Sequence, residues 1–372
     1  SFGQTGELYF GVYVGGSTGI MEPVDPIVED MAKVRPTVLI AVPRVFNKVY
    51  ARIHNMMREA GGLKEKLFNS AKKEAEKKRE TGKASIKFKI LDKLVFGKIR
   101  DRFGGRLKEA ITGSAAMNPE IAKFFIDIGI PTYDCYGLTE TTPAMTMNSP
   151  GANRLGSVGR AIEKVTVVID KGFVGKDSED GEIICYGPNV MQGYHNKPEK
   201  TAEVIVTDPK LGRGFRTGDR GRLDKDGFLF ITGRFKEEYK LENGKYVHPA
   251  SIEEDIKLNA YALNAMLYGE GKPYNVCLLV PDFEALASVA EEMGLDDKSP
   301  EDLIKEEKIY DFLKTEITNH LKKKYGGYEI PKKFILLPED FSLENGTLTQ
   351  TMKLKRGNVF EKYQDQLDAL YN

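Results

Sequence analysis

Tyr136-Gly137-Leu138-Thr139-Glu140 places an aromatic ring, a glycine, a hydroxyl and a carboxylate within five residues. An aromatic ring can stack on a nucleotide base, and a glycine lets the backbone approach a ligand closely. The hydroxyl can meet a phosphate, and the carboxylate can hold Mg²⁺. The pentapeptide alone is weak evidence, because Tyr136 can equally be a core aromatic. Its weight comes from the residues around it.

Strands and helices alternate on the N-terminal side of this pentapeptide. Residues 37–42 form an apolar run between two prolines, typical of a strand buried on both faces of a parallel sheet, and a helix is predicted over 44–59. A second strand, helix and strand are predicted over 107–136, the helix beginning at Asn118-Pro119-Glu120. The pattern predicts a doubly wound α/β layer. Ligands bind at the carboxyl ends of such strands, where Gly113-Ser114-Ala115 and Gly137–Glu140 fall.

The rest of the chain shows a different pattern of predicted strands and helices. Short strands separated by Gly, Asp and Pro are predicted at 165–170, 181–186 and 227–232, so we expect residues 151–233 to form a β-rich subdomain of the core. After a boundary at 233–236, a strand at 274–280 and helices at 308–324 and 354–370 predict a small α+β C-terminal lid domain over 234–372. Residues 1–150 then form the α/β part of the core.

Composition limits the classes of function. The 55 basic and 55 acidic residues cancel, so no global field attracts nucleic acid. The negative mean hydropathy and the lack of a long apolar run argue against a transmembrane helix. Three cysteines, far apart, favour a reducing compartment, and the four histidines show no metal-ligand spacing. We expect a cytoplasmic protein.

One segment departs from this charge balance. A helical insertion predicted at about 60–102 carries 14 Lys or Arg and 6 Asp or Glu between Lys64 and Arg102. Two interpretations stay open. The segment is a solvated insertion whose apolar side chains pack on the domain, or it makes peripheral contact with an anionic membrane surface. Its interspersed apolar residues are Leu67, Phe68, Ile86, Phe88, Ile90, Leu94, Val95 and Phe96.

Three further motifs follow Tyr136–Glu140 in order. They are Thr217-Gly218-Asp219, Gly233-Arg234-Phe235-Lys236 and Thr349-Gln350-Thr351-Met352-Lys353. With these four signals the sequence resembles the acyl-adenylate-forming enzymes, and among them the AMP-forming long-chain fatty acyl-CoA synthetases. The resemblance runs from Ser1-Phe2-Gly3-Gln4 to the final helix.

The resemblance implies a ligase that converts a long-chain fatty acid and ATP to acyl-AMP and then transfers the acyl group to CoA, with Mg²⁺ as cofactor. Family members are longer and carry a phosphate loop ending in Lys, which is absent here, so we expect this chain to be the C-terminal portion of a longer enzyme and incomplete for catalysis. Two alternatives stay open. One is a related ligase for another carboxylic acid, and the other is a noncatalytic fragment that only binds nucleotide.

The resemblance also assigns nucleotide-binding roles. It implies that Thr139 contacts the α-phosphate and that Glu140 holds Mg²⁺. It places Tyr136 against adenine, with Asp134 and the Gly113-Ser114-Ala115 backbone at the edge of the base. Asp219 suits a ribose, because a carboxylate can accept both vicinal hydroxyl protons, and Arg234 could close the sugar from the other side.

In the C-terminal part, Lys236 matches the hinge of a mobile lid in related enzymes. Asn243-Gly244 would give the pantetheine arm of CoA a narrow passage, although a plain hairpin turn explains the pair equally well. Lys240 and Tyr246 are further candidates for nucleotide contact. Lys353 is the expected catalytic lysine, although Lys355 and Arg356 are equivalent by residue type alone.

The acyl pocket is expected to begin at Phe2-Gly3. Gly15 and Gly16 lie on the following apolar segment, where residues without side chains could leave room for an acyl chain. A β-bulge is the alternative explanation for glycines in such a segment.

Overall fold

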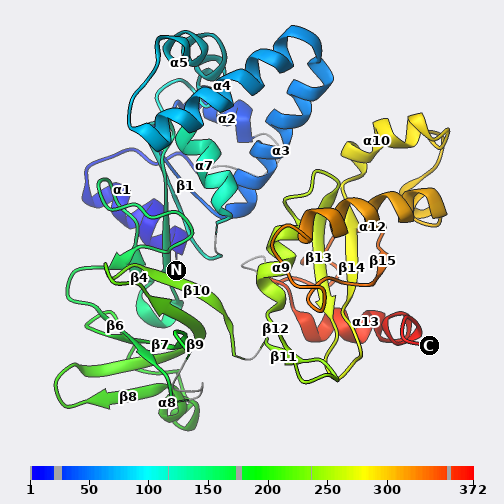
Figure 1. Cartoon of the computed structure of the whole chain (residues 1–372). Coiled ribbons are helices and arrows are strands. Elements are labelled where there is room, and N and C mark those ends of the chain that lie inside the picture. The colour runs from blue at the N-terminus through cyan, green and yellow to red at the C-terminus, as the bar shows by residue number, and fades with distance from the viewer. Residues whose placement is uncertain (1, 21–26, 116, 173–177, 236, 350–352) are drawn as a thin grey trace. The chain divides into compact units, whose positions relative to one another are not determined.

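The computed structural model describes residues 2–20, 27–115, 117–172, 178–235, 237–349 and 353–372. The chain divides into two compact units, Ser1–Thr232 and Gly233–Asn372. The division falls beside the boundary expected at 233–236. Each unit is described separately below (Figure 1).

The first sheet of unit 1 has the strand order β1-β2-β3-β4-β5. Strands β1 (Val38–Ala41), β2 (Glu109–Thr112) and β3 (Thr132–Gly137) are parallel, with Ile40 opposite Ile111 and Ile111 opposite Tyr133. Strands β4 (Ala144–Met147) and β5 (Arg160–Ala161) then extend the sheet in antiparallel fashion. The predicted α/β class and its three strands are confirmed.

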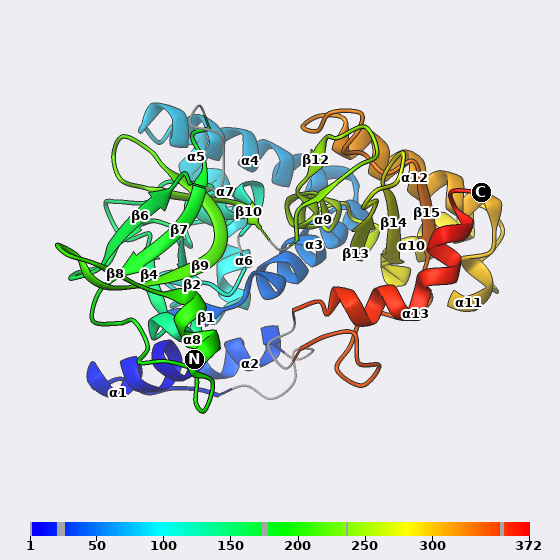
Figure 2. The same ribbon diagram turned by 90° about the horizontal axis from the view of Figure 1, so that it is seen from below.

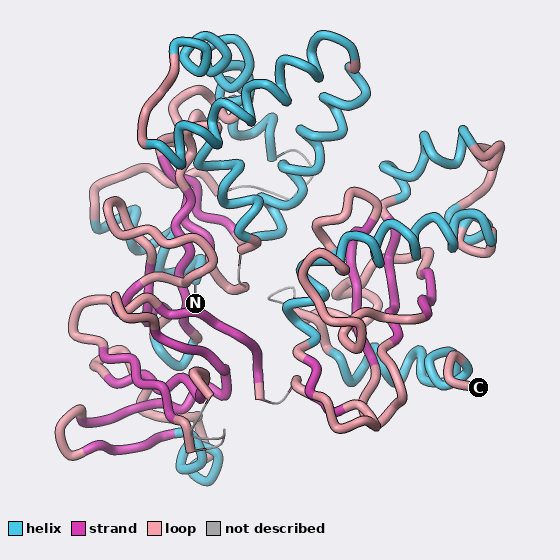
Figure 3. The backbone as a smooth tube through the Cα atoms, viewed as in Figure 1, coloured by secondary structure: helices cyan, strands magenta, loops and turns pink. Residues whose placement is uncertain are grey.

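Helices accompany this sheet, and Figure 3 shows most of them gathered at one end of unit 1. Asn118 Oδ1 accepts a hydrogen bond from the Glu120 backbone N–H at 2.8 Å and Pro119 is the first helical residue, so the predicted Asn-Pro-Glu start is confirmed. The helices of the N-terminal part are η1 (Gln4–Tyr9), α1 (Phe10–Tyr13), α2 (Ile27–Val34), α3 (Pro43–Ala60), α4 (Gly62–Thr81), α5 (Ile86–Leu91), η2 (Asp92–Phe96), α6 (Gly97–Arg102) and α7 (Pro119–Asp127).

The second sheet of unit 1 has the order β10-β9-β7-β6, with β8 paired to β9. Its strands are β6 (Thr166–Asp170), β7 (Gly181–Tyr186), β8 (Ile205–Asp208), β9 (Gly212–Leu223) and β10 (Leu229–Arg234), and the short helix α8 (Pro198–Val204) precedes β8. This sheet begins later than residue 151, because β5 pairs with β4 in the first sheet. The close return is possible because residue 159 is glycine: a Cβ there would lie 1.9 Å from the Met147 carbonyl carbon.

One hydrophobic cluster joins the two sheets of unit 1. Tyr136 and Met145 from the first sheet share it with Ile183, Phe215 and Leu229 from the second. Because protein interiors are close-packed, this shared core fixes β3 against the second sheet. The end of β3 is therefore held beside β9.

Unit 2 consists of a three-stranded sheet covered by helices. Strands β13 (Ala262–Tyr268) and β14 (Val276–Pro281) are antiparallel, β14 and β15 (Lys333–Leu336) are parallel, and β11 (Tyr239–Lys240) pairs with β12 (Tyr246–Val247) in a separate hairpin. The helices are α9 (Pro249–Ile256), α10 (Phe283–Glu292), α11 (Pro300–Leu303), α12 (Glu307–Leu321) and α13 (Arg356–Ala369). The predicted small α+β domain is confirmed.

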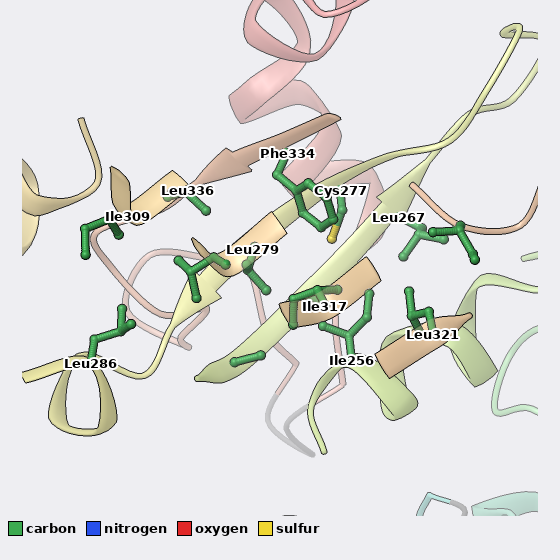
Figure 4. Close-up of a cluster of buried hydrophobic side chains, with 14 of the residues drawn as sticks. Ile256, Leu267, Cys277, Leu279, Leu286, Ile309, Ile317, Leu321, Phe334 and Leu336 are labelled. Carbon is green, nitrogen blue, oxygen red and sulfur yellow. The ribbon is translucent and has the colours of Figure 1, made fainter. Parts of the chain in front are cut away.

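Unit 2 has its own core. Figure 4 shows Leu267, Leu279 and Phe334 of the sheet beside Ile317 and Leu321 of α12. Both faces of β14 are buried, and its second face packs on the cluster that includes Val359 and Leu367 of α13. Within the described residues of either unit, no helix combines the length and apolarity needed to cross a membrane.

Candidate nucleotide and catalytic site

The end of β3 is built around a glycine that cannot be replaced. A Cβ at Gly137 would lie 1.7 Å from the Pro143 carbonyl oxygen, because the chain folds back at the short 3-10 turn Thr139–Thr141. The Thr141 hydroxyl accepts a hydrogen bond from the Leu138 backbone N–H at 2.9 Å. Asn189, in the loop that follows β7, donates a hydrogen bond to the carbonyl oxygen of Thr141 at 2.9 Å and thereby supports the turn. The turn leaves Thr139 exposed at the carboxyl end of the strand.

Glu140, the predicted metal ligand, is held by a partner that the sequence did not indicate. The Tyr194 hydroxyl donates a hydrogen bond to Glu140 Oε1 at 2.9 Å. Burial and the neighbouring carboxylate raise the pKa of Tyr194 to about 12, so this hydroxyl keeps its proton at neutral pH. Tyr194 also lines an open pocket with a volume of about 580 Å³.

The residues fit Mg²⁺ in the form that this ion takes in nucleotide enzymes. Among the residues that the structure describes, no group of three or more His, Cys, Asp or Glu side chains could hold a metal alone. Mg²⁺ is usually bound by one or two carboxylates together with substrate phosphates and water. Glu140 beside the exposed Thr139 matches that requirement, with the nucleotide supplying the other ligands.

Two predicted motifs meet directly in unit 1. The Tyr136 hydroxyl donates a hydrogen bond to Asp219 Oδ2 at 2.6 Å, although the residues are 83 positions apart. Asp219 is only 3% exposed, and its backbone N–H donates to the Thr217 hydroxyl at 3.0 Å. The motif sits where the pairing of β7 with β9 shifts register between Glu182 and Ile184, and such bulges re-aim side chains.

Asp134 lies on β3 two residues before Tyr136. Its Oδ1 is buried and has no hydrogen-bond partner among the described residues. Burial raises the pKa of Asp134 to about 8, against the opposing effect of a hydrogen bond from the Met117 backbone. A buried acceptor without a partner is costly unless a ligand supplies a donor. The orphaned oxygen therefore fits the exocyclic amino group expected at the edge of an adenine.

The turn after β2 is close to this residue. A Cβ at Gly113 would lie 2.8 Å from Cys135 Sγ and 3.0 Å from Phe2 Cε2, so a larger residue there would have to displace one of these side chains. Ser114 has a left-handed backbone, with φ of 72°, and Ser114 and Ala115 are exposed. The structure thus gathers Gly113, Asp134 and Tyr136 at neighbouring strand ends, as the fold class predicts.

The predicted acyl-pocket residues differ in burial, and their role stays a prediction. Phe2 is half-buried against Gly113, and Gly3 follows it at the start of the N-terminal helical segment. Gly15 and Gly16 are exposed beyond α1. Of this set, Phe2 is the residue that the structure places against the predicted nucleotide turn.

Asp219→Ala is expected to weaken ATP binding by about 1.5–3 kcal/mol, the range for hydrogen bonds to a charged group. Tyr136→Phe is the matched variant, because it keeps the ring for stacking and removes only the donor to Asp219. We expect it to weaken binding less than Asp219→Ala. Titration calorimetry with a non-hydrolysable ATP analogue measures both, with thermal melting as the control for folding. Unchanged affinity in a folded Asp219→Ala variant would remove Asp219 from the ribose site.

The linker and the hairpin of unit 2 carry the next candidates. Lys236 lies outside the described residues, so its hinge role stays a prediction. Arg234 ends β10 at the division between the units, and its predicted closing of the ribose stays a prediction too. Lys240 and Tyr246 are opposite each other in the β11–β12 hairpin, with Lys240 Nζ 4.7 Å from the centre of the Tyr246 ring.

Asn243 and Gly244 form the turn of this hairpin. Gly244 has φ of 80°, and its N–H donates to the Leu241 carbonyl oxygen at 2.9 Å. Apart from the two chain neighbours of Gly244, no described residue has an atom within 4 Å of a Cβ placed there. The turn conformation therefore explains the glycine, and the CoA passage stays a prediction.

The structure separates the three cations near the C-terminus. Arg356 forms a bidentate ion pair with Glu253 of α9, with Nη1 to Oε1 at 2.8 Å, and approaches Glu237 at 3.7 Å. Lys353 and Lys355 are exposed. Lys353 precedes Leu354, which forms a β-bridge with Leu348, and the Thr349 N–H donates to the Lys353 carbonyl oxygen at 2.8 Å. Arg356 is thus a structural residue, and Lys353 remains the catalytic candidate.

Comparison with known protein families shows to which family this arrangement of motifs belongs. The model of the AMP-binding enzyme family matches residues 1–195, and the model of the AMP-binding enzyme C-terminal domain matches residues 238–372. The chain belongs to the AMP-binding enzyme family. The two matches fall on the two units that the structure separates.

Curated relatives of this AMP-binding enzyme are similar over nearly its whole length. Long-chain-fatty-acid–CoA ligase 5 of Rattus norvegicus is 35% identical over 96% of this chain and 52% of its own. Peroxisomal long chain acyl-CoA synthetase 6 of Arabidopsis thaliana is 32% identical over 98% of this chain and 52% of its own. The chain thus spans about half the length of these relatives.

Solved structures agree on the fold. The A domain of a carboxylic acid reductase from Segniliparus rugosus, solved with AMP and a co-purified carboxylic acid, superposes with a TM-score of 0.73 at 24% identity. The superposition covers 96% of this chain and 51% of the reductase chain. At this identity the likeness establishes the adenylate-forming fold.

Proposed function

We propose that this chain supplies the nucleotide-binding part and the C-terminal domain of an ATP-dependent, AMP-forming ligase that makes acyl-CoA from a long-chain fatty acid. The observation that carries the proposal is the hydrogen bond between Tyr136 and Asp219, which unites two motifs of the predicted nucleotide site. The names of the curated relatives support the fatty acid as substrate and CoA as acyl acceptor.

In the proposed reaction a carboxylate oxygen of the acid attacks the α-phosphorus of ATP, and the bond to pyrophosphate breaks. The CoA sulfur then attacks the acyl carbon, its proton leaves, and AMP departs. Mg²⁺, when bound, neutralises charge on the phosphates. The chain's own residues position the reactants: Asp219 and Tyr136 hold the sugar and base, and Thr139 stands at the α-phosphate. Catalysis of this kind depends on positioning and electrostatics.

ATP–pyrophosphate exchange with a panel of acids tests the proposal on the full-length protein that contains this chain. Exchange that depends on long-chain fatty acids would support it. Exchange only with aryl, amino or medium-chain acids would show that the proposed substrate class is wrong and that the proposed adenylation is right. Nucleotide binding without any exchange would favour the noncatalytic alternative.

Glu140→Gln is expected to raise the Mg²⁺ concentration needed for half-maximal exchange, because a hard cation loses a charged oxygen ligand. Tyr194→Phe is the matched variant: it removes the hydroxyl that holds Glu140 and leaves the charge in place. We expect a smaller shift in the same direction. The measurement is exchange rate against Mg²⁺ at fixed ATP. A Mg²⁺ dependence identical to that of the wild type in Glu140→Gln would contradict the metal role.

A further inference from the structure

The helical segment from Ile86 to Arg102 is apolar on two opposite sides. Its inner side holds Phe88, Leu91, Phe96 and Ile99, all buried. Its outer side holds Ile86, Ile90 and Leu94, which are 79%, 55% and 52% exposed. Their spacing of four residues puts them in one row along the helix. We call this row, with Lys83, Lys87, Lys89, Lys93 and Lys98 around it, the lysine-flanked stripe.

Hydrogen bonds through Ser85 attach the start of the segment to α4. The Ser85 hydroxyl accepts a hydrogen bond from the Phe88 N–H at 2.9 Å and donates to Glu74 Oε2 of α4 at 2.8 Å. Helices α4 and α5 lie side by side in Figure 1 and in Figure 2. The inner side packs within unit 1, whereas more than half of each side chain in the outer row is exposed. A contiguous exposed apolar surface of this kind often marks an interaction site.

Charge indicates what covers the row. Between Lys83 and Lys98 the sequence holds five lysines and one acidic residue, Asp92, which is paired with Arg100 at 2.8 Å. All five lysines are exposed. Apolar side chains bordered by lysines suit an anionic lipid surface, where the apolar groups enter the acyl region and the ammonium groups stay at the headgroups. A second copy of the chain docked symmetrically on this row would set lysines against lysines.

We propose that the lysine-flanked stripe docks this protein on a bilayer that carries anionic lipids. The row of Ile86, Ile90 and Leu94 enters the headgroup boundary, and Lys89, Lys93 and Lys98 supply the electrostatic attraction. This inference is independent of the adenylation chemistry, because the stripe contains none of the predicted site residues.

Tryptophan fluorescence tests the insertion directly, because the sequence has no Trp. The single reporter Ile90→Trp is placed on the stripe, and Leu223→Trp, at another exposed leucine, is the matched control. Vesicles of phosphatidylcholine and phosphatidylglycerol should shift the emission of Ile90→Trp to the blue, and brominated acyl chains should quench it. The control should change in neither respect. An Ile90→Trp spectrum that ignores these vesicles would overturn the proposal.

Vesicle co-sedimentation of the full chain measures how much the lysines and the apolar row each contribute to the affinity for vesicles. Lys89→Gln/Lys93→Gln/Lys98→Gln should weaken binding to anionic vesicles about a hundredfold, from roughly fivefold per lysine. Ile86→Ser/Ile90→Ser/Leu94→Ser should weaken it at least tenfold, whereas Leu211→Ser/Leu223→Ser/Leu343→Ser should not. Binding should also fall at high salt. Equal binding to pure phosphatidylcholine would refute the proposal. A stripe variant that leaves vesicle binding unchanged and alters only self-association or binding to an acidic protein would also refute the proposal.

Discussion

Lys353→Ala is expected to slow acyl-adenylate formation roughly 100- to 1,000-fold, the usual effect of removing one preorganised charge from a transition state, about 2.7–4 kcal/mol. A lysine carried by a closing domain can place its charge where the carboxylate attacks and pyrophosphate leaves. Lys353 is exposed, its carbonyl oxygen accepts a hydrogen bond from the Thr349 N–H, and the next residue, Leu354, forms a β-bridge with Leu348. Its replacement should therefore leave folding intact.

The second half-reaction provides the decisive comparison. Given presynthesised acyl-adenylate and CoA, Lys353→Ala should form thioester at a rate close to that of the wild type, if that step uses the other face of the lid. Lys355→Ala, an exposed lysine two residues further on, is the matched control and should leave both steps nearly unchanged. Single-turnover measurements of each step on the full-length protein decide the matter. Equal losses in both half-reactions would mean general damage and would remove Lys353 from its role.

Arg356→Ala is expected to destabilise unit 2 by about 3–5 kcal/mol, the usual cost of leaving one member of a buried ion pair without its partner. Glu253 is only 6% exposed. It accepts two guanidinium N–H groups of Arg356 and also the Leu267 backbone N–H at 2.6 Å. Without Arg356 the carboxylate stays buried between α9 and β13 with its charge uncompensated.

Amide hydrogen exchange is the appropriate measurement for Arg356→Ala, because the chain has two units and a single unfolding transition would mix them. Protection should fall in β13 and α9, including the Leu267 amide, and stay unchanged in unit 1. Adding Glu253→Gln should recover part of the loss, because it removes the buried charge and keeps an acceptor for Leu267. Unchanged protection in Arg356→Ala would show that the pair is not an anchor.

The sequence by itself determined the local elements and the identity of the motifs. The apolar run at 37–42 and the Asn118-Pro119-Glu120 start predicted β1 and α7, because strand burial and helix capping depend on adjacent residues. The order of the four motifs predicted the adenylate-forming family, which the family models confirm. The motif alone suggested that Gly137 allows a ligand to approach the backbone closely, and only the structure showed that the Pro143 carbonyl oxygen requires glycine there.

Only the tertiary structure decided which side chains are partners. No sequence periodicity links Glu140 to Tyr194 or Arg356 to Glu253, because these pairs are 54 and 103 positions apart. The tertiary structure also decided which apolar residues of the helical insertion are buried. Phe68, Phe88 and Phe96 are buried, whereas Ile86, Ile90 and Leu94 are exposed. Local patterns fix a residue's place on its helix or strand. The packing of distant segments determines what that residue then meets.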